Sequence, residues 1–120
     1  MKATLVLVGA VFLLLLGFAL GAPPVATAQA KLDGKAIFLA QKCNLCHDVS
    51  TAAITATTKS AALKGPDLTG KASKRDATLL NNYLRKKVDI DGKKHKKEFS
   101  GSDEEIGALI AWLQQQEKKK

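Results

Sequence analysis

The chain has 120 residues, with 19 Lys and Arg against 11 Asp and Glu, and its formal net charge is +8. This length fits one domain and excludes a multi-domain enzyme, a TIM barrel or a full dinucleotide-binding fold. Aromatic residues make up only 5% of the chain, so a core of protein side chains alone would be thin.

The N-terminal segment has the layout of a secretory signal peptide. A lysine at position 2 precedes an almost purely apolar run from Leu5 to Leu20, and small-x-small triplets end at Ala28 and Ala30. We expect a signal peptide over 1–28 and export to the periplasm. An uncleaved anchor facing the periplasm is the alternative, because the apolar run is just long enough to span a bilayer. The rest is expected to comprise a tether over 29–32, a domain over 33–117 and a basic tail over 118–120.

Helical periodicity without strand-like alternation predicts an all-α domain with long loops. The expected helices run from Asp33 to Lys42, from Arg75 to Lys87, and from the Ser102 N-cap onward. Ser73 with Asp76 resembles a capping box for the second helix, and Ser102 with Glu105 forms one for the third. The Thr-, Ala- and Ser-rich stretch from Val49 to Leu63 is expected to be a loop, with at most a weak turn of helix.

The residues that indicate a chemical function most clearly are Cys43-Asn44-Leu45-Cys46-His47, which form a Cys-x-x-Cys-His motif. In an exported protein this motif is typical of c-type haem attachment. Two thiols three positions apart on a helical turn face one side and can each add to a haem vinyl group. His47 is then held beneath the iron as the proximal ligand.

Three other uses of these residues are weaker. A Cys43–Cys46 disulfide would close a very small loop and stabilise little. A thioredoxin-like redox pair needs a βαβ context, which the pattern lacks. A zinc site from Cys43, Cys46, His47 and His95 is disfavoured because adjacent Cys46 and His47 suit one tetrahedral ion poorly.

On these residues the chain resembles a class I c-type cytochrome, single-haem and exported, from about Lys31 to Gln115. Gly34 and Phe38 look like the family's glycine–aromatic pair on the first helix, and Leu109 and Trp112 look like its partner pair on the last. In the family these helices cross, and the glycine permits their close approach. The resemblance implies a small cytochrome c fold of three to four helices around one covalent haem c.

The resemblance also assigns a haem pocket. Gly65-Pro66-Asp67-Leu68 is similar to the family's Gly-Pro-x-Leu turn, in which the proline carbonyl accepts the N–H of the proximal histidine. By this analogy the Pro66 carbonyl would orient His47, and Leu68 would pack on the porphyrin. The pocket residues implied by the resemblance are Gly65, Pro66, Leu68, Tyr83 and Phe99.

The family's usual second axial ligand, a methionine, is missing, since the only methionine is Met1. By its spacing from Phe99, Lys96 stands where that methionine would be expected, and His95 is its neighbour. We favour His95 as the sixth ligand because a lysine must lose a proton to bind iron, whereas imidazole need not at neutral pH. Lys96 is the runner-up, and an open or water-bound position is the third possibility. A reduction potential well below that of a His/Met cytochrome follows.

These features predict a periplasmic one-electron carrier and not an enzyme. The alternative is a ligand-binding haem sensor or a small peroxidase with a labile sixth ligand. We expect a monomer that binds no nucleic acid and meets membranes only through an uncleaved N-terminal segment or weak contacts of its basic surface. Six lysines are expected to form a docking patch for acidic redox partners, with a merely solvated face as the alternative: Lys86, Lys87, Lys93, Lys94, Lys96 and Lys97.

Overall fold

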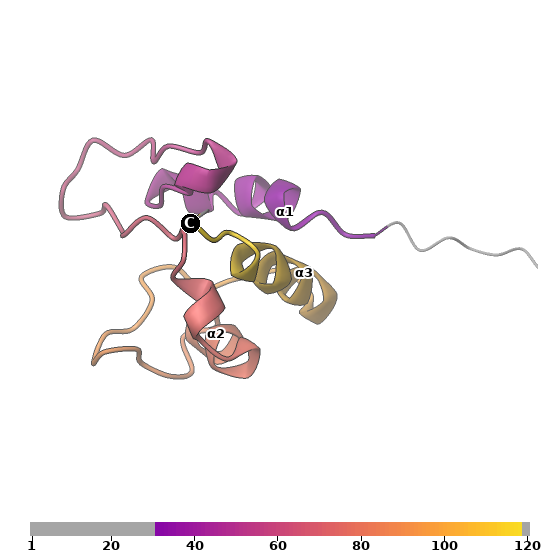
Figure 1. The fold of residues 1–120 in the computed structure, drawn as a ribbon. Coiled ribbons are helices and arrows are strands. Elements are labelled where there is room, and N and C mark those ends of the chain that lie inside the picture. The colour runs from indigo at the N-terminus through magenta and orange to yellow at the C-terminus, as the bar shows by residue number, and fades with distance from the viewer. Residues whose placement is uncertain (1–30, 119–120) are drawn as a thin grey trace, which may run out of the picture.

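The computed structural model describes residues 31–118 and has the all-α architecture that the sequence predicts. Its helices are α1 (Gly34–Ala40), α2 (Ala77–Leu84) and α3 (Asp103–Gln114). Short 3-10 helices lie at Cys43–Leu45, Ser50–Ala52 and Ala72–Lys74. Figure 1 shows α3 beside α1, α2 on its other side, and long loops before and after α2.

The predicted signal peptide or anchor lies outside the described residues, as do parts of the predicted tether and basic tail. Within residues 31–118, no helix has both the length and the apolar character needed to cross a membrane. The same part of the chain contains no strand, and its only β-type pairs are two isolated bridges.

The crossing of α1 and α3 depends on Gly34. A Cβ atom at this position would lie 2.3 Å from the Trp112 Cβ and 2.4 Å from the Ala108 carbonyl oxygen, too close for any side chain. One turn further along α1, the ring of Phe38 contacts that of Trp112, with centroids 5.5 Å apart. Leu109 is buried in the same interface. The contact predicted between the two residue pairs is therefore confirmed.

Caps fix where α1 and α3 begin. The Asp33 carboxylate accepts from the backbone N–H groups of Lys35 and Ala36, as expected of an N-cap. At α3 the predicted capping box is present: the Ser102 hydroxyl accepts from Glu105 N–H, and the Glu105 carboxylate accepts from Ser102 N–H.

The second helix is shorter than predicted, and its predicted capping box is wrong. Asp76 is itself the N-cap, because its carboxylate accepts from the N–H groups of Thr78 and Leu79. Ser73 lies in the preceding 3-10 turn, and Arg75 between them is extended. The helix ends at Leu84 because Lys86, two residues on, has a left-handed backbone with φ of 58°.

The core is small and includes a residue that the sequence pattern did not single out. Val49 is fully buried and pairs with Ile54 through an isolated bridge, so the predicted loop from Val49 to Leu63 is anchored at its start. By contrast, α2 has no fully buried residue. The buried apolar side chains are Ile37, Phe38, Val49, Ala72, Phe99, Ile106, Leu109, Ile110 and Leu113.

Candidate functional site

The two cysteines lie directly after α1. Lys42 adopts a left-handed conformation, with φ of 57°, and turns the chain into the 3-10 helix that starts at Cys43. Cys43 and Cys46 are both half-buried and are not joined by a disulfide. Burial raises the pKa of the Cys43 thiol, and the Lys97 ammonium opposes part of that rise. Because no disulfide joins them, both thiols are free to bond to another group.

The zinc alternative gains no support from the geometry. Across residues 31–118, no three His, Cys, Asp or Glu side chains converge as they would around a metal ion held by protein ligands alone. A cofactor that brings its own equatorial ligands needs only axial donors from the protein, and the two histidines are the candidates.

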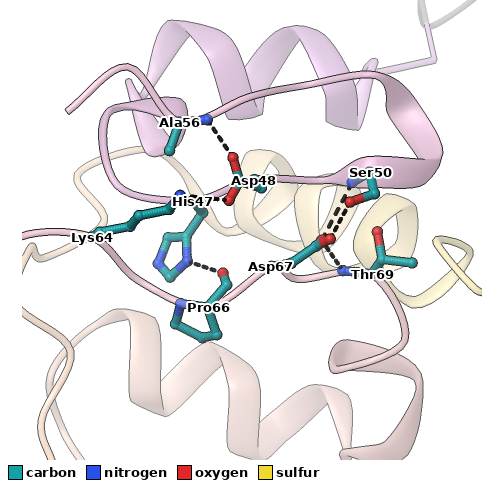
Figure 2. A network of polar contacts seen from close by, with 8 residues as sticks. All are labelled: His47, Asp48, Ser50, Ala56, Lys64, Pro66, Asp67 and Thr69. Atoms are coloured by element: carbon teal, nitrogen blue, oxygen red, sulfur yellow. Dashed lines mark hydrogen bonds and ion pairs between the residues drawn. The ribbon is translucent and has the colours of Figure 1, made fainter. Parts of the chain in front are cut away.

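The His47 ring is fixed by the turn at Pro66. Its Nδ1–H donates to the Pro66 carbonyl oxygen over 2.8 Å, which is the contact that the resemblance implied (Figure 2). Since a carbonyl can only accept, the proton is on Nδ1 and the lone pair of Nε2 is left for a metal. Gly65 packs against the ring so closely that a Cβ there would lie 2.3 Å from Cε1 and 2.6 Å from Nδ1.

A carboxylate that the sequence reading did not single out holds this turn in place. Asp67 accepts from the backbone N–H and the hydroxyl of Ser50, and from the N–H of Thr69 over 2.9 Å (Figure 2). These hydrogen bonds stabilise the charged form and lower the pKa of Asp67 to about 2. The Asp-x-Thr spacing is a known turn signal, because an aspartate readily accepts from the backbone two residues on.

A second carboxylate, beside His47 in the chain, ties down the preceding loop. Asp48 accepts from the N–H of Ala56 over 2.7 Å, and its other oxygen lies 3.5 Å from the Lys64 ammonium (Figure 2). Backbone hydrogen bonds from Gly65 to Cys46 and from Leu68 to Asp48 pair the two segments directly. Hydrogen bonds and one ion pair to residues 56–68 thus hold the chain on both sides of His47.

The ring of His95, in the loop between α2 and α3, lies next to that of His47. The two ring centroids are 6.1 Å apart, and the ring planes differ by only 9°. The Nδ1–H of His95 donates to the Lys97 carbonyl oxygen, so Nε2 is again the nitrogen left for a metal. Burial lowers the pKa of His95, which keeps its imidazole neutral and able to donate a lone pair. The edge of the Tyr83 ring contacts His95 at a centroid distance of 5.4 Å.

This pair of imidazoles has the spacing that one metal ion between them requires. With metal–nitrogen bonds of about 2 Å on each side, the centres of two imidazole rings on opposite sides of an ion lie about 6 Å apart. The observed 6.1 Å meets that requirement, and a carbonyl on each Nδ1 orients both rings in the manner typical of metal-ligating histidines. Two imidazoles at this separation, each with Nε2 left as the donor, would fit an iron held between them.

The remaining predicted residues divide between this site and the core. Leu68 packs against the core from a half-buried position, and Phe99 is buried in it, with the Arg85 guanidinium 5.9 Å from its ring centre. Lys96 has its ammonium against the Ala62 carbonyl. The six lysines of the predicted docking patch are all exposed.

Comparison with known proteins identifies one family. The family model described as Cytochrome c matches residues 32–117, a range that holds all three helices, both cysteines and both histidines. Neither curated proteins nor solved structures give a significant match.

Proposed function

Because the chain belongs to the cytochrome c family, which carries a covalent haem c and transfers electrons, we propose that it is a periplasmic single-electron carrier of low reduction potential. The iron, when bound, accepts and releases one electron. Cys43 and Cys46 would hold the haem through thioether bonds, His47 would be the proximal ligand, and His95 would be the sixth. The observation that carries this proposal is the parallel pair of imidazoles 6.1 Å apart.

The low potential follows from the donor atoms. A thioether sulfur raises the potential of a c-type haem, and axial ligands together tune it over a wide range. No methionine is present in residues 31–118, so both axial donors would be imidazole nitrogens. Hydrogen bonds from each Nδ1–H to a carbonyl raise the basicity of the rings, which favours the more highly charged ferric iron.

The preformed pair also favours a carrier over a sensor or peroxidase. A carrier needs ligands that stay in place when the iron changes oxidation state. Each imidazole ring here has a backbone carbonyl that orients it. Lys96 is a weaker candidate for the sixth position because its ammonium already donates to the Ala62 carbonyl. The sensor or peroxidase alternative needs an open sixth position, and the described residues offer no observation that favours it.

The location and the partners complete the proposal. The signal-like pattern of residues 1–30 supports export to the periplasm. The exposed lysines around His95, with a net charge of +8, support docking to redox partners with acidic surfaces, because opposite charge speeds productive encounter.

The first experiment is an electron paramagnetic resonance spectrum of the ferric holoprotein. We expect a low-spin signal of the bis-histidine type, and conversion to high spin in the His95→Ala variant. Lys96→Ala is the matched control and should keep the low-spin signal. A dominant high-spin signal in the unaltered protein, or an unchanged signal in His95→Ala, would overturn the assignment of His95. Rapid and complete carbon monoxide binding by the ferrous protein would favour the sensor or peroxidase.

A redox titration tests the potential separately. We expect a midpoint well below the range of His/Met cytochromes of this fold. A midpoint within that range would contradict imidazole ligation on both sides of the iron.

A further inference from the structure

The segment that carries His95 is attached to the rest of the molecule by side chains rather than by its backbone. Within the described chain, the last backbone–backbone hydrogen bond before it ends at Lys93, and the next begins at Phe99. Residues 94–98 make none. A stretch without such bonds opens at little cost in free energy, so side-chain contacts must decide how long His95 stays in place.

Two lysines of this segment reach across to other parts of the fold. The Lys96 ammonium donates to the Ala62 carbonyl in the loop before α2. The Lys97 ammonium donates to the carbonyl of Gln41, the C-cap residue of α1. Carbonyl groups at the C-terminal end of a helix lack partners within the helix and carry partial negative charge, so a cation is favourable there.

Lys97 combines this contact with another one. Its backbone carbonyl accepts from the Nδ1–H of His95, so the residue that orients the ring also anchors the segment. The anchor point, Gln41, is two residues before Cys43 and therefore belongs to the same short stretch as the thiols and His47. Ser100 strengthens the junction, since its hydroxyl lies 3.3 Å from the Gln41 side-chain oxygen.

We propose that Lys97 is a positioning residue for the sixth ligand: its ammonium, bound to the Gln41 carbonyl, holds the His95 segment against the His47 side of the site. This inference rests on the proposed function, because it takes His95 as the sixth ligand. Lys96 also anchors the segment, but only Lys97 of the six exposed lysines combines an anchoring contact with the carbonyl that orients the His95 ring.

The test compares Lys97→Ala with Lys94→Ala in the haem-loaded protein. Lys94 is the matched control because it lies in the same segment, is exposed, and carries the same charge. The readouts are amide hydrogen exchange of Lys93 and Phe99, whose hydrogen-bonded N–H groups flank the segment, and the rate of carbon monoxide binding to the ferrous protein. The loss of one charge-assisted hydrogen bond should raise both by roughly tenfold in Lys97→Ala. Lys94→Ala should match the unaltered protein, and Lys97→Arg should largely restore it.

Equal exchange and binding rates in Lys97→Ala and Lys94→Ala would overturn the inference. If Lys97→Ala does not mature, Lys97→Gln, which removes the charge with less loss of length, is compared in the same way. The spectrum of His95→Ala keeps the two proposals apart. If that variant loses the low-spin signal while Lys97→Ala behaves like its control, only the role of Lys97 fails. If His95→Ala keeps the signal, the proposed function fails as well.

Discussion

Replacing Gly65 with alanine tests whether the turn at Pro66 sets the position of His47. The added Cβ would lie 2.3 Å from Cε1 of the imidazole, whereas carbon atoms in contact stay about 3.5 Å apart or more. The ring or the turn must therefore move by about 1 Å, while metal–ligand distances tolerate only about 0.2 Å. Such a shift should weaken the iron–His47 bond and lengthen the hydrogen bond from Nδ1–H to the Pro66 carbonyl.

The assay is the ferric spectrum of the haem-loaded Gly65→Ala variant, followed by urea unfolding. We expect a high-spin fraction that the unaltered protein lacks and a loss of about 1–3 kcal/mol in the free energy of unfolding, as for other overpacked sites. Gly107→Ala is the control because a Cβ there meets nothing within 4 Å, and in α3 it should stabilise by up to about 1 kcal/mol. A Gly65→Ala protein with the same ferric spectrum and the same urea midpoint of unfolding as the unaltered protein would refute the reasoning.

Three further predictions concern the helix crossing, the Asp67 network and the haem. Gly34→Ala should lower the free energy of unfolding by about 1–3 kcal/mol, because the added Cβ would meet Trp112, and urea titration followed by Trp112 fluorescence would measure this. The pKa of Asp67 falls from its ordinary value near 4 to about 2 on folding. The stabilisation that the Asp67 carboxylate contributes is therefore complete above about pH 4 and is lost as the pH falls through about 2. Asp67→Asn should be less stable than the unaltered protein at pH 6, and most of that difference should be gone at pH 2. A difference in unfolding free energy that does not change with pH would contradict this. The double variant Cys43→Ser/Cys46→Ser, unable to hold haem covalently, should show little helical circular dichroism at 37 °C, because ligand binding and folding are coupled. A double variant that unfolds at the same urea concentration as the haem-loaded protein would refute that coupling.

The sequence predicts those elements whose causes are local. The first and last helices carry their own caps in the sequence. Gly34 and Trp112 predict the crossing because they match the paired positions of the family that the chain resembles. The start of α2 was harder to predict, because Ser73 and Asp76 are both capable caps and only the folded backbone selects Asp76.

Other features depend on contacts between distant segments, which periodicity does not reveal. The burial of Val49 and the bonds from Ser50 to Asp67 lie in a stretch without a clear hydrophobic repeat. The sequence favours His95 by its place next to Lys96 in the loop before α3 and by its donor chemistry. Its position 6.1 Å from His47 results from how the two loops around α2 fold back, and this cannot be deduced from either segment separately.

The two histidines are held by different kinds of contact, and this difference bears on how the protein works. The His47 segment is paired by backbone hydrogen bonds, from Gly65 to Cys46 and from Leu68 to Asp48, and by the Asp67 network. The His95 segment has only side-chain contacts along residues 94–98. Any condition that loosens the site should therefore release His95 before His47. The stability of this one loop, rather than that of the helices, would then decide whether the iron stays closed to small ligands and the protein remains an electron carrier.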